Sequence, residues 1–156
     1  MLEVNDKVKD FTLNDTSGKP WTLSENLDKK IILYFYPKDS TPGCTTQACT
    51  YRDATSDFEK LGAKVVGISA DDQASHEKFV NKHDLNFTLL SDPDKEVIKA
   101  FGAYGEKNVF GKKIVGIIRS SFIINQDGVI EKVFPKASPK KNAQEIIDYL
   151  SKPEAE

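Results

Sequence analysis

The feature that most constrains the fold is a run of six apolar residues, Ile31 to Tyr36, which ends at Pro37. An uninterrupted run of β-branched and aromatic residues is typical of a strand buried on both faces of a sheet. Thr41 followed by Pro42 has the pattern of a helix N-cap with proline at the first helical position. Because apolar residues then recur at helical spacing, the sequence predicts a helix over residues 42–61.

A second apolar segment, Lys64 to Ala70, follows this helix and predicts a second buried strand. A strand, a helix and a strand in succession form a right-handed parallel unit by default. Two short segments near the N-terminus, 11–13 and 21–23, flank a turn and predict a β-hairpin.

Further helices and strands are expected along the rest of the chain. The expected helices are 73–83, 94–101 and 142–151, the expected strands are 87–90, 117–125 and 129–134, and a loop is expected over 102–113. This alternation predicts an α/β fold with a central mixed sheet that helices cover on both faces. We expect a single domain over residues 1–156.

Charge and composition exclude several classes of function. Lys and Arg number 22 and Asp and Glu number 24, so the net charge of −2 argues against a nucleic-acid partner. Apolar residues make up 38%, too many for a disordered chain. The longest apolar run has six residues, against about 20 for a membrane-spanning helix. Residues 1–6 are acidic and polar, so we expect no uncleaved signal peptide and take the cytoplasm as the default location.

Both cysteines of the chain, Cys44 and Cys49, lie near the start of the predicted helix. With Thr41 as the N-cap, Cys44 is the third helical residue, where backbone N–H groups still lack partners. These groups and the helix dipole stabilise a thiolate by about 0.3–1 kcal/mol, and at most about 2 kcal/mol. Only about 3% of an ordinary thiol is ionised at pH 7, so an efficient nucleophile needs a nearby cation as well.

The spacing between Cys44 and Cys49 is too long for a disulfide within an undistorted helix. Five residues correspond to a rise of about 7.5 Å and a turn of about 140°. The two Cα atoms then lie about 8–9 Å apart, beyond the reach of an unstrained disulfide. Either the pair never bonds, or the first helical turns unravel to bond it. Short segments at a helix start open at low cost in free energy.

The stretch from Tyr36 to Cys49 resembles the active-site segment of peroxiredoxins, and specifically of the PrxQ subfamily, also called bacterioferritin comigratory protein. The core of the motif is Pro-x-x-x-Thr-x-x-Cys, formed here by Pro37, Thr41 and Cys44. The second cysteine five residues later is a mark of the subfamily. The resemblance covers nearly the whole chain; further matching segments are 51–53, 67–69, 86–92, 101–102, 105–107 and 119–124, the last of which begins with Arg119.

This resemblance implies a thioredoxin-like fold and a thiol peroxidase. Cys44 is then the peroxidatic cysteine, whose thiolate attacks a peroxide oxygen and becomes a sulfenic acid. Cys49 is the resolving cysteine, which forms an intrachain disulfide with Cys44. Thr41 would hydrogen-bond the peroxide and the thiolate. Arg119 would supply the positive charge and hold the peroxide oxygens, and Pro37 would shield the thiolate from water.

The same resemblance implies the partners. The substrates are hydrogen peroxide and organic hydroperoxides, and thioredoxin or a similar dithiol protein reduces the disulfide. No metal and no organic cofactor is implied. The position of Cys49 favours an intrasubunit disulfide and a monomer. Gln47 stands where many members have Glu, and Asn125 where Asp often ends the strand that bears Arg119; neither is expected to touch the peroxide contacts.

The residues alone leave other interpretations of the two cysteines open. Buried cysteines often have only a structural role, although the Thr-Pro-Gly segment before Cys44 argues against it. Cys44, Cys49, His76 and His83 are four potential zinc ligands, with both histidines on one helical face, but the cysteine spacing is wider than usual for zinc. A dithiol–disulfide oxidoreductase of the thioredoxin type would need Cys-x-x-Cys, and four residues separate these cysteines.

Two further expectations concern basic residues. Arg119 lies among residues that are expected to be buried, so its charge needs a partner, and a thiolate is a candidate. Lys107, Lys112 and Lys113 lie in or at the end of the expected loop, and we expect them to form a solvated surface rather than a docking site.

Overall fold

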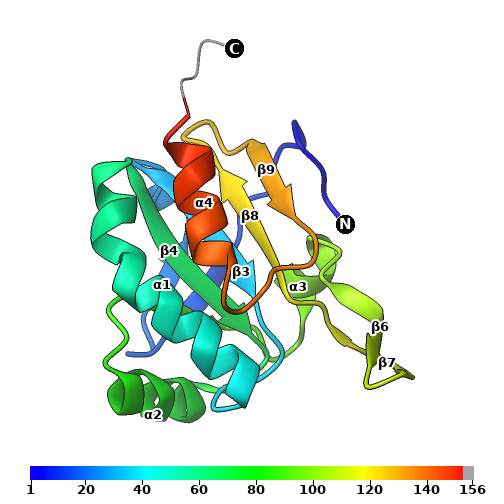
Figure 1. Cartoon of the computed structure of the whole chain (residues 1–156). Helices are drawn as coiled ribbons and strands as arrows, with labels where there is room; N and C mark the ends of the chain where they lie inside the picture. The colour runs from blue at the N-terminus through cyan, green and yellow to red at the C-terminus, as the bar shows by residue number, and fades with distance from the viewer. Residues whose placement is uncertain (153–156) are drawn as a thin grey trace.

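The two predicted buried strands lie side by side at the centre of the structure, a computed structural model that describes residues 1–152 (Figure 1). β3 (Lys30–Phe35) and β4 (Ala63–Ser69) pair in parallel, and α1 (Pro42–Lys60) connects them. β8 (Ser120–Ile124) pairs antiparallel with β3 on its other side. The predicted strand–helix–strand unit and the mixed sheet are therefore confirmed.

The sheet has seven strands in the order β2-β1-β5-β4-β3-β8-β9. The strands not yet given are β1 (Thr12–Asp15), β2 (Pro20–Thr22), β5 (Thr88–Ser91) and β9 (Ile130–Phe134). β1 and β2 form the expected N-terminal hairpin, which joins the sheet through the antiparallel pairing of β1 with β5. A short 3-10 helix, Leu23–Glu25, follows the hairpin.

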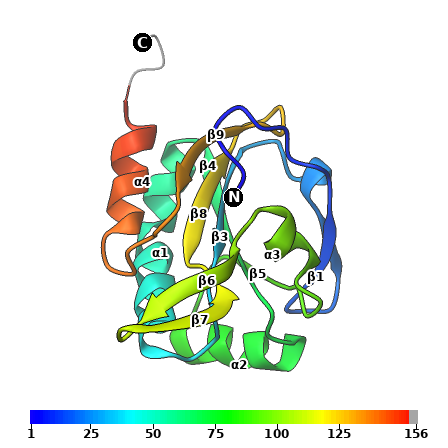
Figure 2. The same ribbon diagram turned by 90° about the vertical axis from the view of Figure 1, so that its right-hand side faces the viewer.

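Helices cover both faces of this sheet. α1 and α4 (Asn142–Leu150) lie against one face, and α3 (Glu96–Ala100) lies against the other (Figure 2). α2 (Gln73–His83) packs into the same core as α1, through the buried side chain of Phe79. Alternate residues of β3 serve the two cores: Ile31, Leu33 and Phe35 pack with α3, whereas Ile32 and Tyr34 pack with α1. Because both faces are buried, the run of apolar residues is uninterrupted.

The expected loop over 102–113 is wrong, because most of it forms a two-stranded hairpin. β6 (Tyr104–Val109) pairs antiparallel with β7 (Lys112–Ile117). The turn residues Phe110 and Gly111 both have positive φ, of 52° and 80°, as tight hairpin turns require. Phe-Gly is not a usual signal for this turn, and lysines interrupt the alternation, so the sequence pattern missed it.

The same hairpin shifts the start of the next strand. The strand expected over 117–125 begins only at Ser120, because Ile117 ends β7. Ile118 and Arg119 form the two-residue link between β7 and β8. Arg119 therefore lies just before a central strand rather than within it. Across the helices of residues 1–152, none combines the length and the apolar character needed to cross a membrane.

Candidate active site

The first turn of α1 places Cys44 directly after the loop that leaves β3. Thr41 ends this loop with an extended backbone (φ −82°, ψ 154°), and the helix begins at Pro42. Cys44 is therefore the third helical residue, as the sequence predicts. The Thr41 side chain makes no capping hydrogen bond; its hydroxyl donates to the carbonyl oxygen of Lys38 at 2.9 Å. Its oxygen can still accept a hydrogen bond from a bound molecule.

Arg119 brings a positive charge to the sulfur of Cys44. Its Nη2 lies 3.4 Å from Sγ, and its Nη1 donates to Oε1 of Gln47 at 2.8 Å. Cys44 is only 2% exposed, so the guanidinium and the sulfur meet in a site with little water. A charged donor at this distance stabilises negative charge on the sulfur. Arg119 thus provides the cation that a helix start alone lacks.

Gly43 makes the approach of this guanidinium possible. A Cβ added at Gly43 would lie 3.1 Å from Nη2 of Arg119. This distance is shorter than ordinary van der Waals contact, so a side chain here would press the guanidinium away from its position above the helix start. The glycine is needed for close packing against the arginine.

Gln47 accepts a hydrogen bond from Nη1, the other terminal nitrogen of the guanidinium. Sequence reasoning gave Gln47 no such role. Its side chain is fully buried, and its Nε2 donates to the hydroxyl of Tyr51 at 3.4 Å. The expectation that Gln47 touches none of the residues assigned to the peroxide is wrong, since it contacts Arg119, to which the resemblance gives that role. The signal was available in the helical spacing, because residues three apart, such as Cys44 and Gln47, lie on one face.

Tyr51 anchors this chain of hydrogen bonds in the protein core. Its hydroxyl lies 3.0 Å from Oγ of Ser121 on β8 and also donates to Oδ1 of Asn142 at the start of α4. Burial raises the pKa of Tyr51 from 10.0 to about 12, although its hydrogen bonds act in the other direction. The phenol therefore stays protonated at neutral pH. Through Gln47, the position of Arg119 is tied to three elements of the fold.

Cys49 lies further along the same helix and is not bonded to Cys44. Both cysteines are free, and Cys49 is half-buried. Because α1 is continuous from Pro42 to Lys60, the helix keeps the two Cα atoms about 8–9 Å apart. The structure therefore presents the two cysteines as free thiols, with the helix start intact.

The remaining sequence-predicted residue, Pro37, lies in the loop between β3 and α1 and is half-buried. The structure thus brings Cys44 and Arg119 into contact. It places Thr41 and Pro37 in the loop that leads to Cys44, and it places Cys49 more than one helical turn beyond. Each predicted site residue belongs to α1, to the loop before it, or to the link before β8.

Lys107 on β6 contributes a second positive charge beside Arg119. Its Nζ donates to the carbonyl oxygen of Ile117. Burial lowers the pKa of Lys107 and the charge of Arg119 lowers it further, whereas Cys44 acts in the opposite direction. The expectation of a solvated lysine is therefore wrong for Lys107, but Lys112 and Lys113 are exposed as expected.

A groove of about 620 Å³ opens beside Arg119. Its lining combines charged and apolar side chains: the positive Lys107, Arg119 and Lys136, the acidic Glu106, and the apolar Ile118, Pro135 and Ala137. Such a lining accommodates an apolar group next to a polar or anionic end. The groove therefore places apolar side chains beside Arg119, the residue whose guanidinium contacts Cys44.

The four residues considered as zinc ligands are not brought together. Within residues 1–152, the group of three or more metal-ligating side chains is Asp39, Asp71 and His76, without a cysteine. The Cys44 sulfur faces Arg119 instead, and the ring of His83 packs edge-on against Phe79 with centroids 5.4 Å apart.

Comparison with known proteins is consistent with this geometry. The sequence pattern described as the AhpC/TSA family matches residues 4–133. The bcp peroxiredoxin of Helicobacter pylori strain J99 is 46% identical over 149 residues, which cover 96% of this chain and 98% of that protein. Peroxiredoxin Bcp of Bacillus subtilis is 41% identical over 149 residues, with 96% and 95% covered.

A solved structure is also similar over most of the chain. The bacterioferritin comigratory protein of Xanthomonas campestris, whose alkyl peroxide reduction activity was studied in trapped intermediate and ligand complexes, is 35% identical. It aligns with a TM-score of 0.83 over 90% of this chain and 89% of its own.

Proposed function

We infer the roles of the site residues from one premise: this chain belongs to the AhpC/TSA family and is a peroxiredoxin of the Bcp/PrxQ type, with a thioredoxin-like fold and thiol-dependent peroxidase activity. We propose that Cys44 is the peroxidatic cysteine. The observation that carries this assignment is the contact of 3.4 Å between Nη2 of Arg119 and Sγ of Cys44. It combines a cation with the unpaired N–H groups of a helix start at one sulfur.

In the proposed reaction, the Cys44 thiolate attacks the terminal oxygen of a hydroperoxide. A sulfur–oxygen bond forms as the oxygen–oxygen bond breaks, and the departing oxygen takes up a proton to become water or an alcohol. The sulfur is oxidised to a sulfenic acid. Arg119 stabilises the charge that passes from sulfur to the departing oxygen, because its guanidinium already lies beside the attacking atom.

We assign Thr41 and Pro37 to the binding of the peroxide. The Thr41 hydroxyl donates to the carbonyl oxygen of Lys38, so its lone pairs are oriented to accept the O–H of a hydroperoxide. This contact would fix which of the two peroxide oxygens faces the sulfur. Pro37 has no N–H group and is half-buried, so it would limit the access of water to the loop.

Cys49 is the proposed resolving cysteine. Its thiolate attacks the sulfenic sulfur of Cys44, a disulfide forms within the chain, and hydroxide leaves and is protonated to water. The helix holds the two Cα atoms about 8–9 Å apart, so its first turns must unravel for this step. We therefore expect a folded helix start for peroxide attack and an open one for resolution.

The proposed cycle ends when a dithiol protein of the thioredoxin kind reduces the disulfide. An intrachain disulfide needs no second subunit, which supports a monomer. Dithiol reductants keep thiols reduced in the cytoplasm, which supports that location. The groove beside Arg119 supports organic hydroperoxides as substrates in addition to hydrogen peroxide.

A coupled assay tests this function directly. The purified protein is mixed with thioredoxin, its reductase and either hydrogen peroxide or an alkyl hydroperoxide, and peroxide consumption is followed by stopped flow. We expect thioredoxin-dependent consumption of both peroxides and little reduction of insulin. Reduction of insulin without peroxide consumption would instead indicate a dithiol–disulfide oxidoreductase.

A further inference from the structure

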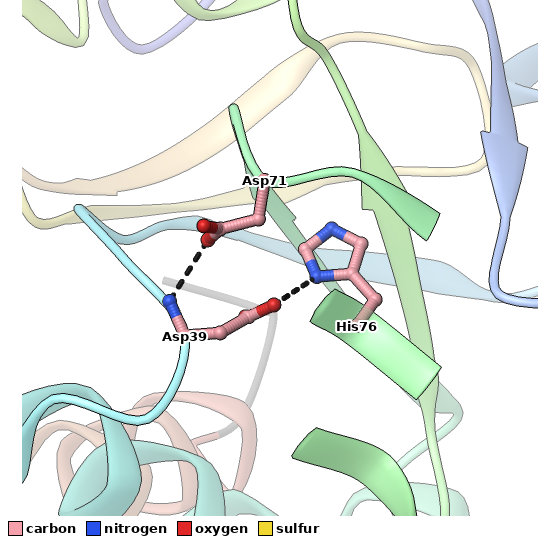
Figure 3. A group of neighbouring side chains, drawn as sticks. All are labelled: Asp39, Asp71 and His76. Atoms are coloured by element: carbon pink, nitrogen blue, oxygen red, sulfur yellow. Dashed lines mark hydrogen bonds and ion pairs between the residues drawn. The ribbon is translucent and has the colours of Figure 1, made fainter. Parts of the chain in front are cut away.

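A buried polar network lies next to the active-site loop, and the reaction described above does not use it. Its centre is the pair Asp39 and His76, which are 4% and 0% exposed. Nδ1 of His76 lies 2.7 Å from Oδ2 of Asp39, as Figure 3 shows. Asp39 belongs to the loop between β3 and α1, two residues before Thr41, whereas His76 belongs to α2.

The neighbours of the His76 ring fix the number of protons in this pair. Nε2 lies 3.0 Å from the carbonyl oxygen of Leu90, which only accepts hydrogen bonds, so Nε2 carries a proton. Nδ1 faces a carboxylate oxygen of Asp39. One further proton must lie between Nδ1 and this oxygen, since two lone pairs would otherwise repel at 2.7 Å. A short hydrogen bond therefore joins the two side chains in the core.

The rest of the network attaches the loop to α2 and β4. Oδ1 of Asp39 accepts from the hydroxyl of Tyr36 at 2.6 Å, and Oδ2 also accepts from Oγ of Ser75 at 2.8 Å. The backbone N–H of Asp39 donates to Oδ2 of Asp71 at 2.8 Å (Figure 3). Asp71 in turn accepts from Oγ of Ser69 at 2.7 Å. Hydrogen bonds within the protein thus occupy both carboxylate oxygens of Asp39 and Oδ2 of Asp71, which are atoms that could otherwise bind a cation.

The tyrosine of this network remains a donor at any moderate pH. Burial raises the pKa of Tyr36 well above its ordinary value, and the neighbouring Tyr34 and the carboxylate of Asp39 add to this effect. Directly after Asp39, the backbone of Ser40 has a φ of 64°, a conformation that residues other than glycine rarely adopt. The hydrogen bonds on Asp39 therefore hold a segment whose backbone would relax if they were released.

We propose that Asp39 and His76 are positioning residues for the peroxide reaction. They clamp the loop from Tyr36 to Thr41 to the core, so that α1 begins at Pro42 with Cys44 beside Arg119. This inference rests on the proposed role of Cys44. None of the clamp contacts involves a residue of α1, so the clamp holds the loop while the first turns of the helix unravel during resolution.

The clamp therefore affects the two chemical steps differently. Attack on peroxide needs the loop and the helix start in their folded arrangement, because Thr41, Cys44 and Arg119 must converge on one oxygen. Disulfide formation needs the helix start to open. A weaker clamp should slow the attack on peroxide and leave disulfide formation unchanged or faster. A general loss of stability would instead lower the fraction of folded protein without changing the rate constants of the folded molecules.

The test compares Asp39→Asn with Asp92→Asn in quench-flow experiments followed by mass spectrometry. Asp92 is also buried, at 2% exposed, and its carboxylate accepts hydrogen bonds from the backbone N–H groups of Glu96 and Ile98 in α3, neither of which belongs to the clamp. We expect Asp39→Asn to lower the second-order rate constant of sulfenate formation at Cys44 at least tenfold. The first-order rate constant of disulfide formation should not fall. Asp92→Asn should leave both constants within about twofold of the wild type.

Tyr36→Phe gives a second, milder test that does not depend on the folding of Asp39→Asn. It removes one hydrogen bond to Asp39 and should slow attack about threefold without slowing resolution. Equal rate constants of attack in the wild type and in both clamp variants would overturn the proposal, and so would equal loss of both steps. Absence of a Cys44 sulfenate in the wild type would instead contradict the proposed function of Cys44.

Discussion

The first turn of α1 and the turns that follow it place their cysteines in opposite surroundings. Cys44 is buried, lies 3.4 Å from a guanidinium and occupies a helix start with unpaired N–H groups. Cys49 is half-buried in the continuous part of the helix, where backbone N–H groups are already bonded. One sulfur is therefore arranged to react in the folded structure, and in the proposed reaction the other reacts only after the helix start opens.

The second difference concerns what holds each segment in place. Beyond Cys49, Tyr51 ties the helix to β8 and α4 through Ser121 and Asn142. The first turn has no such anchor of its own, because the Thr41 side chain does not cap the helix. A helix that is fixed beyond its second cysteine, and whose first turn lacks a side-chain cap, can open locally without unfolding the domain.

Replacing each cysteine in turn separates the two roles with the largest expected effect. Cys44→Ser should abolish peroxide turnover, because no other thiol lies beside Arg119. Cys49→Ser should consume about one equivalent of peroxide and then stall, with further oxidation of Cys44 when no external thiol is present. Peroxide titration with mass spectrometry measures both outcomes. Equal loss of the first turnover in the two variants would contradict the assignment of the peroxidatic role to Cys44 and the resolving role to Cys49.

Removing the cation should have the next largest effect. Arg119→Ala should lower the second-order rate constant with hydrogen peroxide by about 10²- to 10³-fold, because one charged donor at the reacting atoms is lost. Lys112→Ala on the β6–β7 hairpin is the matched control, since Lys112 is an exposed cation. Its rate constant should equal that of the wild type. A normal rate constant for Arg119→Ala would remove this residue from the mechanism.

The stabilising role of Tyr51, which follows Cys49 along the helix, can be tested through the pH dependence of the free energy of unfolding. The pKa of Tyr51 is raised from 10.0 to about 12, so the folded protein keeps a proton that the unfolded chain loses above pH 10. This contribution to the free energy of unfolding, about 2–3 kcal/mol, is present below pH 10 and is lost as the pH rises towards 12.

Tyr51→Phe lacks this contribution. We expect the variant to be less stable than the wild type at neutral pH, and the difference to close between pH 10 and pH 12. Denaturant unfolding at a series of pH values measures it. Parallel stability curves for the two proteins across this range would show that Tyr51 does not act as a protonated anchor.

The smallest of these effects concerns Gln47, whose side chain is hydrogen-bonded to both Tyr51 and Arg119. Gln47→Ala should slow peroxide attack about tenfold, because a buried hydrogen bond to the guanidinium is lost at about 1–3 kcal/mol. Gln47→Glu keeps an oxygen acceptor at this position and should restore most of the rate. Failure of Glu to rescue the rate, while Ala slows it, would show that the side chain does not act by orienting Arg119.

The sequence predicted those parts of the fold that local patterns determine. The buried run before Pro37 and the Thr41-Pro42 pair located β3 and the start of α1, and helical spacing placed the other helices to within a few residues. The hairpin over residues 104–117 was missed because Ile117 is the one buried residue of its two strands and lysines recur along them, so the sequence lacks the alternation of a buried face.

The sequence also indicated which residues of the proposed site lie close together, but not the contacts that support them. Pro37, Thr41, Cys44 and Arg119 belong to one resemblance, and the contact between Arg119 and Cys44 agrees with it. Helical spacing places Gln47 on the same face of the helix as Cys44, but it does not identify Arg119, 72 residues away, as the partner of Gln47. The clamp of Asp39 and His76 likewise depends on the packing of α2 against the loop, which local spacing does not indicate.

Time-resolved mass spectrometry of the wild-type protein tests the central assignment most directly. One equivalent of peroxide is added to the reduced protein, and the oxidation state of each cysteine is followed. We predict that a sulfenic acid appears at Cys44 first and is then converted into a disulfide with Cys49 of the same chain. Oxidation that begins at Cys49, or a disulfide that forms only between two chains, would contradict this account.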